Sequence, residues 1–412
     1  MTSLPPAIRR APEDTKVLLL EGIHPLADQS LKAAGYQVTS LGRALDEDEL
    51  VAALDGVHLL GIRSKTQVGE RALEAAPELT AIGAFCIGTN QIDVAGATER
   101  GVAVFNAPFS NTRSVVELAL AEIIALTRRL TEKDRGMHAG VWDKSADGLH
   151  EVRGRRLGIV GYGNIGAQLS VLAENLGMSV LFYDTADKLP LSMARPAGSL
   201  EELLESVDIV TLHVDGRPGN SGMFGEAEFA RMRPGSLFLN LSRGFVIDYP
   251  ALRRHLVSGH IAGAAIDVFP QEPKGRGDEF RSELRGLPNV ILTPHIGGST
   301  EEAQSDIGAF VANKLATFAE EGNTTLSVNL PSVALPASPD MSRVIHVHLN
   351  MPGVLAQVNS ILAGHQVNVE GQLLNTRGEY GYLITDIRGD YSDEVLDQLR
   401  AMSQTVRLRV LS

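Results

Sequence analysis

Short apolar runs alternate with amphipathic runs through the first hundred residues of the chain. The alternation predicts strands and helices in turn at 17–20, 26–34, 58–62, 70–76, 80–85 and 94–99. A chain in which strands alternate with helices forms a parallel sheet that carries the helices on its faces. The block from residue 16 to residue 108 is therefore predicted to be α/β.

A second alternation of the same kind follows a long helical pattern that runs from residue 111 to about residue 130. Its apolar runs predict strands at 157–160, 179–183, 208–213, 236–240, 262–268 and 290–292. This block, 156–294, is predicted to form a second doubly wound parallel sheet.

The last block begins after a stretch with Pro331, Pro336 and Pro339, which cannot continue a helix and suits a domain linker. Its pattern predicts, in order, a strand, a helix, two strands, a helix and a strand at 343–350, 352–365, 367–374, 380–388, 393–402 and 405–411. The order βαββαβ is the ferredoxin-like arrangement.

Composition and charge narrow the possible partners. Of 412 residues, 50 are acidic and 37 are basic, which gives a formal net charge of −13. An acidic chain repels nucleic-acid backbones and anionic lipid head groups, so neither is expected as a partner.

The single cysteine, Cys86, cannot form an intrachain disulfide. Residues 1–14 lack the apolar core of a signal peptide and are predicted to be a frayed leader, so the expected location is the cytoplasm.

A glycine-rich sequence follows the first strand of the second block. Residues 161–166 read Gly-Tyr-Gly-Asn-Ile-Gly and open a helix, and Asp184 ends the next predicted strand. In a dinucleotide fingerprint of this spacing, Gly161 permits the tight turn, Gly163 lets the backbone approach a pyrophosphate, and Gly166 lets helix and strand pack closely. The alternative is a glycine-rich turn that binds nothing, which leaves Asp184 unexplained.

Asp184 also indicates which dinucleotide is bound. Its carboxylate can accept hydrogen bonds from ribose hydroxyls but repels a 2′-phosphate. The next three residues, Thr185, Ala186 and Asp187, bring no cation to offset that repulsion. The predicted cofactor is NAD.

Three polar residues come just after predicted strands of the second sheet, where open α/β sheets place their ligands. They are Arg243, Glu272 and His295. An arginine can clamp a carboxylate, a histidine can take a proton from a hydroxyl near neutral pH, and a carboxylate can fix that histidine's tautomer. Together they suit hydride transfer from a 2-hydroxy acid, without a metal. Taken singly, they could also be a surface ion-pair partner, a solvated loop acid and a helix cap.

Six separated segments resemble, in order, the D-2-hydroxyacid dehydrogenase family, and within it the bacterial enzymes that carry a C-terminal ACT domain. The segments are 88–93, 106–115, 161–166, 242–244, 266–269 and 293–300. The resemblance implies three domains: a flavodoxin-like substrate domain, a Rossmann NAD domain and an ACT regulatory domain. Their implied ranges are 1–110 with 299–337, 111–298, and 338–412.

The resemblance also implies an activity, the NAD-dependent oxidation of D-3-phosphoglycerate to 3-phosphohydroxypyruvate at the start of serine biosynthesis. By position, Arg243 would hold the substrate carboxylate, His295 would be the general acid/base and Glu272 its partner. Asp267 would lie at the nicotinamide carboxamide. The implied cofactor-binding residues are Gly161, Gly163, Asn164, Ile165, Gly166, Asp184, Leu241, Ser242, Arg243, Asp267, His295, Gly297 and Gly298.

The substrate phosphate needs cations, and Arg63, Ser64 and Lys65 form the best-placed basic cluster of the first block. The family pattern here is Arg-Ser-Arg, and lysine cannot make the bidentate fork of arginine. Ordinary surface charges are the alternative interpretation of this cluster.

An ACT domain is a small-ligand sensor, and the resemblance implies that this one binds L-serine in a homotetramer. The matching residues are His348, Asn350 and Asn368, whose side chains can bond a carboxylate, an amine and a hydroxyl. Asn350 could instead be a helix N-cap and His348 a strand-surface residue. The family's flexible Gly-Gly linker is replaced here by the stiffer segment 335–339, a departure that bears on the coupling of sensor to active site and not on the binding.

Two other functions remain open. The chain could reduce other 2-keto acids such as 2-oxoglutarate, held by a distal carboxylate at Arg63 and Lys65. It could also be a dehydrogenase-like binding protein, such as a corepressor that senses NADH.

Overall fold

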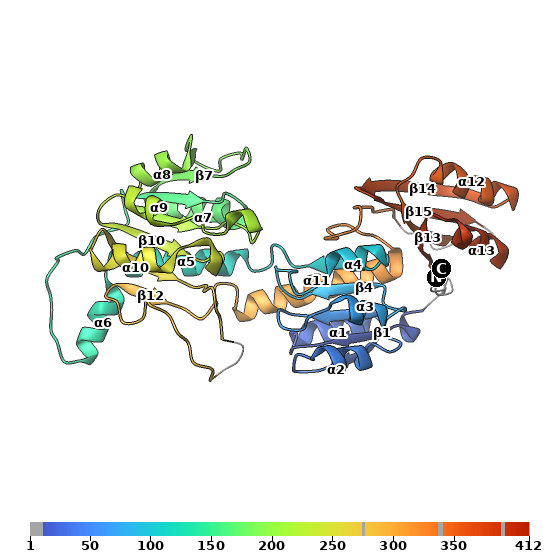
Figure 1. The fold of residues 1–412 in the computed structure, drawn as a ribbon, viewed down its shortest axis with the longest axis horizontal. Helices are drawn as coiled ribbons and strands as arrows, with labels where there is room; N and C mark the ends of the chain where they lie inside the picture. The colour runs from blue at the N-terminus through green and yellow to red at the C-terminus, as the bar shows by residue number, and fades with distance from the viewer. Residues whose placement is uncertain (1–10, 274–276, 337–340, 389–391, 412) are drawn as a thin grey trace. The chain divides into compact units, whose positions relative to one another are not determined.

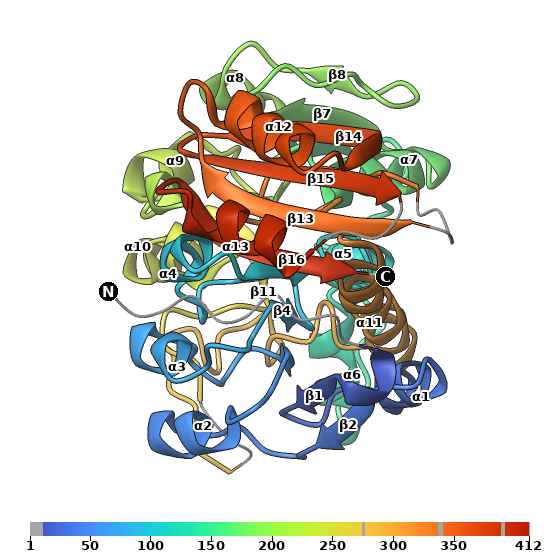
Figure 2. The same ribbon diagram turned by 90° about the vertical axis from the view of Figure 1, so that its right-hand side faces the viewer.

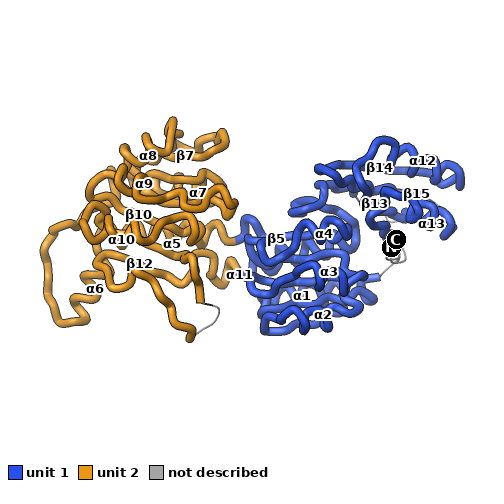
Figure 3. Tube along the Cα trace, in the orientation of Figure 1, with its two compact units in different colours: residues 1–110, 304–412 blue, residues 111–303 orange. Residues whose placement is uncertain are grey.

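The computed structural model describes residues 11–273, 277–336, 341–388 and 392–411. The chain forms two compact units, Met1–Ser110 with Gln304–Ser412, and Asn111–Ala303 (Figure 3). The first ten residues of the predicted leader and residues 337–340 of the predicted linker, with Pro339, lie outside the described residues. The rest of the leader is not frayed, because Pro12–Asp14 form a 3-10 turn that Thr15 closes. No described helix is long and apolar enough to cross a membrane.

The first sheet lies in the first unit, in the part of the ribbon that carries the labels β1 and β4 in Figure 1. It is parallel throughout, in the order β2-β1-β3-β4-β5. Its strands are β1 (Lys16–Leu19), β2 (Gln37–Ser40), β3 (Leu59–Ile62), β4 (Ala81–Ala84) and β5 (Ala103–Asn106). The connecting helices are α1 (Pro25–Ala33), α2 (Glu47–Ala53), α3 (Glu70–Glu74) and α4 (Val94–Glu99).

The hydrophobic pattern does not predict β2, α2 or β5. β2 is an edge strand whose side chains are mostly exposed, so it contains no apolar run. α2 begins at a capping box in which the Asp46 side chain accepts from the Glu49 N–H and the Glu49 side chain accepts from the Asp46 N–H. β5 is a buried four-residue strand.

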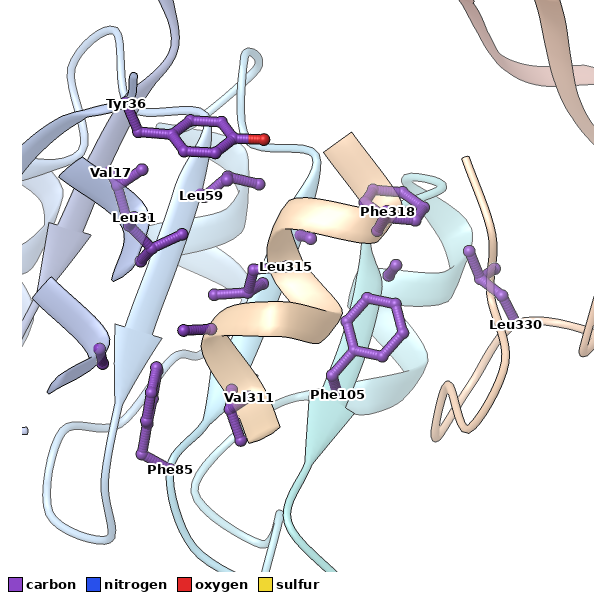
Figure 4. Close-up of a cluster of buried hydrophobic side chains, with 14 of the residues drawn as sticks. Val17, Leu31, Tyr36, Leu59, Phe85, Phe105, Val311, Leu315, Phe318 and Leu330 are labelled. Atoms are coloured by element: carbon purple, nitrogen blue, oxygen red, sulfur yellow. The ribbon is translucent and has the colours of Figure 1, made fainter. Parts of the chain in front are cut away.

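The helix α11 (Glu301–Glu321) returns the chain to this first sheet. Its residues Val311, Leu315 and Phe318 are buried in a cluster with side chains of the sheet (Figure 4). Gly83 in β4 allows the close approach, because a Cβ at this position would lie 2.6 Å from a methyl carbon of Val311. The helix therefore packs directly on the middle of the sheet.

The second sheet fills the other unit, is also parallel, and has the order β12-β11-β10-β9-β6-β7-β8. Its strands are β6 (Arg156–Val160), β7 (Ser179–Tyr183), β8 (Arg195–Pro196), β9 (Ile209–Leu212), β10 (Ser236–Asn240), β11 (Ile261–Ile266) and β12 (Val290–Leu292). Its helices are α5 (Thr112–Thr127), α6 (Leu130–His138), α7 (Asn164–Asn175), α8 (Leu200–Ser206), α9 (Glu226–Arg231) and α10 (Tyr249–Val257).

Two predictions for this unit need correction. The helix predicted from 111 to about 130 ends at Thr127, because Arg129 takes a left-handed φ of 49° and turns the chain into the separate helix α6. The exposed two-residue edge strand β8 extends a sheet for which the pattern predicts six strands. Its side chains carry no apolar signal.

The last block has the predicted βαββαβ order and forms an antiparallel sheet with the order β14-β15-β13-β16. Its elements are β13 (Ser342–Leu349), α12 (Val354–Gly364), β14 (Asn368–Arg377), β15 (Tyr380–Arg388), α13 (Asp393–Ala401) and β16 (Thr405–Leu411). α12 starts two residues later than predicted, because Gly353 precedes it with a left-handed φ of 91°.

The two faces of this third sheet pack against different parts of the chain, while its edge strand β14 stays largely exposed. The helices α12 and α13 lie on one face (Figure 2) and share a core with Val344 and Leu383. On the other face, Ile345, Tyr382 and Ile384 join the cluster that contains α11. The Tyr382 hydroxyl donates to the carbonyl of Gly322, just beyond α11, at 2.6 Å. The sheet is therefore packed onto the α11 region of its own chain.

Candidate active site

The glycine-rich turn between β6 and α7 has the geometry of a phosphate-binding loop. Gly161 has a φ of 92°, and a Cβ at this position would lie 2.6 Å from the carbonyl oxygen of His213. A Cβ at Gly166 would lie 2.3 Å from the Gly161 carbonyl oxygen, so glycine is needed at both positions. By contrast, nothing lies within 4 Å of a Cβ placed on Gly163, the N-cap of α7. The open space at a helix N-terminus suits the approach of a pyrophosphate.

Asp184 follows β7 and is bonded to this turn. Its carboxylate accepts from the backbone N–H of Tyr162 at 2.8 Å and from that of Ala186 at 3.0 Å. A pocket of about 240 Å³ lies beside it, lined also by Lys188 and Arg217. The prediction of NAD rests on the three residues after Asp184 and therefore leaves out these two cations. The guanidinium of Arg217 is engaged by the carboxylate of Asp215.

Glu272 and His295 are brought together after β11 and β12. The carboxylate Oε2 of Glu272 lies 2.8 Å from Nδ1 of His295, and its Oε1 accepts from the Phe269 N–H at 3.1 Å. The hydrogen bond to Glu272 raises the pKa of His295, against the effect of burial. Burial raises the pKa of Glu272, but the bonds from His295 and Phe269 outweigh it and leave that pKa lowered. Glu272 is thus an anion that favours a protonated imidazole.

Asp267 fixes the backbone conformation of the loop that carries His295. It is 1% exposed; its side chain accepts from the Thr293 hydroxyl at 2.7 Å and from the N–H groups of Ile296 and Gly297 at 2.8 and 2.9 Å. The His295 N–H donates to the Asp267 carbonyl at 2.8 Å, and His295 has a left-handed φ of 54°. Such a conformation costs energy in a non-glycine residue and is common at functional sites. Three acceptor contacts of Asp267 therefore hold the histidine loop.

Arg243 follows β10 and lies near the Glu272–His295 pair, since its charge lowers the pKa of both. Its Nη1 donates to the Ser242 carbonyl at 2.7 Å. The next residue, Gly244, packs against the backbone that leads to Glu272, because a Cβ there would lie 2.0 Å from the Phe269 carbonyl carbon. The Arg243 and Glu272 loops are therefore in direct contact.

The remaining predicted cofactor residues lie where the chain leaves β6, β10 and β12. Ser242 is buried, and its side chain and N–H both bond the side chain of Asn240. Leu241 is buried as well. Asn164 and Ile165 open α7 behind Gly163. A Cβ on Gly298 would lie 2.1 Å from the Asn111 side chain.

A second pocket, of about 520 Å³, borders Glu272 and His295 and was not predicted. Its lining combines Glu272 and His295 with Phe269, Phe280 and Arg285. The two phenylalanine rings meet edge to face with their centroids 4.7 Å apart. No local sequence motif brings these residues together, because Phe280 and Arg285 lie in a loop between β11 and β12. Among the described residues, no cluster of three or more acidic, histidine or cysteine side chains could hold a metal.

Arg63, Ser64 and Lys65 form the loop that follows β3, in the other unit. Glu21 organises this loop: its carboxylate accepts from the N–H groups of Arg63, Lys65 and Thr66 at 3.2, 2.9 and 2.8 Å. Glu21 has a left-handed φ of 66°. Glu21 is not among the predicted site residues, because no local motif joins it to a loop more than forty residues away.

The three predicted effector residues do not meet within one chain. His348 and Asn350 line a pocket of about 440 Å³. In the sheet, His348 pairs with Gly381 whereas Asn368 pairs with Arg388, seven positions along β15. At about 3.3 Å per residue, Asn368 is roughly 20 Å away.

Neither alternative interpretation of this site describes the structure. Asn350 is not a helix N-cap, since Gly353 occupies that position and the Asn350 amide donates to the Gly378 carbonyl. His348 is not a surface residue, since it is 2% exposed and its Nε2 is buried without a hydrogen-bond partner among the described residues.

Two family models match the chain. The model of the D-isomer specific 2-hydroxyacid dehydrogenase NAD binding domain matches residues 120–297, and that of the AHAS small subunit-like ACT domain matches residues 344–407. Curated relatives include the D-3-phosphoglycerate dehydrogenases of Haemophilus influenzae and Escherichia coli K12. They are 48% identical over 397 and 399 residues, and each match covers 96% of this chain and 97% of the relative.

Solved structures of 2-hydroxyacid dehydrogenases share the fold. D-2-hydroxyisocaproate dehydrogenase superposes with a TM-score of 0.70 at 26% identity, covering 76% of this chain and 100% of its own. The D-lactate dehydrogenase of Aquifex aeolicus, in complex with NAD and lactic acid, gives 0.64 at 25% identity and covers 74% and 95%.

Proposed function

This chain belongs to the D-3-phosphoglycerate dehydrogenases, within the D-isomer specific 2-hydroxyacid dehydrogenase family, and we propose that its reaction is the oxidation of D-3-phosphoglycerate to 3-phosphohydroxypyruvate. It is an NAD-dependent dehydrogenase, and this reaction begins serine biosynthesis. The observation that carries the proposal is the 2.8 Å contact of His295 with Glu272, in the same unit as Arg243 and the glycine turn.

The proton chemistry follows from this contact. Glu272 faces Nδ1 of His295, so Nε2 is the atom that receives the proton of the C2 hydroxyl. The Glu272 carboxylate stabilises the imidazolium that forms, and the Arg243 guanidinium orients the substrate carboxylate. NAD, when bound along the turn at Gly163 and Asp184, supplies the hydride acceptor.

At the other end of the substrate, we assign Arg63 and Lys65 to the phosphate, with Ser64 between them. The support is the resemblance together with the ordered loop that Glu21 holds. A distal carboxylate could use the same cations, so 2-oxoglutarate is a second candidate substrate.

Substrate choice is tested by following NADH oxidation with 3-phosphohydroxypyruvate, 2-oxoglutarate, pyruvate and glyoxylate. We expect the highest kcat/KM with 3-phosphohydroxypyruvate. A preference for pyruvate or glyoxylate would refute the phosphate assignment. NADH binding without turnover of any of the four would favour the NADH-sensing binding protein instead.

Asp184→Ala is expected to weaken NADH binding and to relax the discrimination against NADPH. The change removes an acceptor for ribose hydroxyls and a charge that repels a 2′-phosphate, and Lys188 and Arg217 then remain beside the pocket. Fluorescence titration with both cofactors measures the effect. Asp187→Ala, at an exposed neighbouring position, serves as the control and should change neither affinity. A wild type that already prefers NADPH would contradict the role of Asp184.

The C-terminal block is an ACT domain, which suggests a small-molecule effector. We propose that the effector is L-serine and that the enzyme is a homotetramer, as the resemblance implies. Because Asn368 lies far from His348 in one chain, a complete site requires Asn368 from a second copy. The cytoplasmic location stays a prediction.

His348→Ala and Asn368→Ala are each expected to abolish serine binding and to leave the uninhibited rate nearly unchanged. Both residues belong to the ACT domain, whereas Arg243 and His295 belong to the other unit. Calorimetry with serine, alongside the NADH assay, measures both effects, and Gln357→Ala on the exposed side of α12 is the matched control. Binding without inhibition would show that the linker uncouples the sensor. No binding to the wild type would refute serine as the effector.

A further inference from the structure

Glu122 is a buried acid that the mechanism above does not use. It lies on α5, is 3% exposed, and is flanked by the core residues Ala119, Ile123 and Leu126. Neither carboxylate oxygen has a hydrogen-bond partner of good geometry among the described residues. A buried carboxylate without donors is strongly disfavoured, and the usual outcome is that the group keeps its proton.

The neighbours of Glu122 belong to the active site. Asp267 and Thr293 both act on it, and the Thr293 hydroxyl donates to Asp267 at 2.7 Å. Burial and then the charge of Asp267 raise the pKa of Glu122 to about 8, against the effect of Thr293. Both effects favour the neutral form of Glu122, and Glu122 stands next to the carboxylate that holds the His295 loop.

Charged groups other than Asp267 also lie around α5. The ionisable residues on or beside the elements that pack against α5 include Arg243 after β10, Asp267 and His295 after β11 and β12, Glu174 on α7, and Arg129, Glu132, Lys133, Asp134, Arg135 and His138 at or on α6. Of these, Asp267 is the group whose charge acts on Glu122. On α5 itself, Glu117 pairs with Arg113 on the exposed side.

We propose that Glu122 determines which oxidation state of the dinucleotide the site prefers, through its protonation. As a neutral acid it adds nothing to the negative charge of Asp267 at the nicotinamide end, and as a carboxylate it adds a second negative charge beside Asp267. The oxidised nicotinamide ring is a cation and the reduced ring is neutral, so the second charge favours NAD⁺ over NADH. The inference rests on the proposed function, because it needs the nicotinamide to lie near Asp267.

The coupling between the protonation of Glu122 and the binding of the two cofactors has a definite sign. Because NAD⁺ binds better to the ionised form, NAD⁺ binding releases the Glu122 proton, and NADH binding does not. The preference for NAD⁺ therefore increases as the pH rises through about 8. His295 also titrates nearby, and its protonated form disfavours NAD⁺, so the contribution of Glu122 must be measured against a variant that keeps His295.

Glu122→Gln provides that comparison, because it keeps the shape of the side chain and removes the titration. NADH affinity is measured by fluorescence titration and NAD⁺ affinity by competition, from pH 6.5 to pH 9. At pH 9, we expect the ratio of NAD⁺ affinity to NADH affinity to be higher in the wild type than in the variant by a factor on the order of ten. A tenfold change in binding corresponds to a change of one unit in the pKa of Glu122. At pH 6.5 the two proteins should agree. Glu117→Gln, on the exposed side of the same helix, should follow the wild type at every pH.

The outcomes separate the inference from the proposed function. If Glu122→Gln follows the wild type at every pH, the inference is wrong although the dehydrogenase assignment stands. If the wild type binds neither cofactor, the proposed function itself is wrong.

Thermal unfolding of the cofactor-free protein tests the protonation state directly. Folding raises the pKa of Glu122 from 4.5 to about 8, so between pH 4.5 and pH 8 the folded protein holds a proton that the unfolded chain releases. The free energy that this proton contributes to stability therefore falls as the pH rises from 4.5 to 8. The Tm of Glu122→Gln relative to the wild type should therefore increase from pH 5 to pH 8 and then level off. A constant difference would overturn the inference. Glu122→Met, which is also uncharged, replaces the glutamine variant if that protein does not fold.

Discussion

Replacing His295 with asparagine is expected to lower kcat by about 10²- to 10⁴-fold, the usual contribution of a general acid/base, while NADH still binds. Asparagine tolerates the left-handed backbone that His295 adopts, with a φ of 54°. The loop held by Asp267 should therefore keep its shape, and only the proton exchange is lost. Steady-state kinetics and NADH fluorescence measure the two effects separately.

His255→Asn is the matched control for this variant. His255 lies in the same unit, and its Nε2 contacts Glu226 at 2.8 Å, much as His295 contacts Glu272. It is outside the proposed site, so its loss should leave kcat unchanged. A His295→Asn enzyme as fast as the wild type would end the proposed mechanism.

The contribution of Glu272 is expected to appear in the pH dependence of the oxidation rate. In Glu272→Gln, the amide oxygen can still accept from the Phe269 N–H, but the negative charge that raises the pKa of His295 is gone. Oxidation needs the neutral imidazole, which forms as the pH rises through this pKa. The rising limb of the oxidation rate should therefore move to lower pH.

The largest loss of stability is expected from Arg343→Met, at about 3–5 kcal/mol. Arg343 and Asp386 form a bidentate ion pair at 2.7 and 2.8 Å, with side chains 6% and 7% exposed. The same guanidinium donates to the carbonyls of Glu321, Leu335 and Pro336, each at 2.8 Å. Its removal leaves a buried, unpaired carboxylate and three carbonyls without their donor. Urea denaturation measures the loss.

Two further variants test whether burial of the ion pair causes the loss of stability in Arg343→Met. Arg343→Met combined with Asp386→Leu should recover part of the stability, because the unpaired charge is removed as well. Arg388→Met breaks the exposed ion pair with Glu370 in the same sheet and should cost less than about 1 kcal/mol. Equal losses in Arg343→Met and Arg388→Met would show that burial of the pair has no energetic weight.

The sequence predicts the architecture wherever apolar periodicity records burial. All six strands predicted for the second block are present, because each is buried or partly buried, whereas the exposed edge strands β2 and β8 leave no such trace. The break at Arg129 is also absent from the pattern, since a single left-handed residue changes the chain direction without changing the hydrophobicity.

For the site, the sequence identifies residues but not the contacts that hold them. The position of His295 after a strand and that of Glu272 after another suggest their roles, and the structure adds the 2.8 Å contact between them. Glu21 and Glu122 are single acids outside any motif, and their roles are inferred only from residues that lie far away in the sequence. The separation of Asn368 from His348 likewise depends on strand pairing, which the order of strands along the chain does not determine.

The contact between the third sheet and α11 has a consequence for exchanging sensors between enzymes. Ile345, Tyr382 and Ile384 belong to the same core as Phe318, and Arg407 donates to the carbonyls of Pro77 and Leu79 in the first sheet's unit. The ACT domain is thus not an interchangeable cassette. A chimera that joins a foreign ACT domain after Pro336 would place an unmatched surface on α11, and a graft that respects this packing must carry α11 and the loop 77–79 with it.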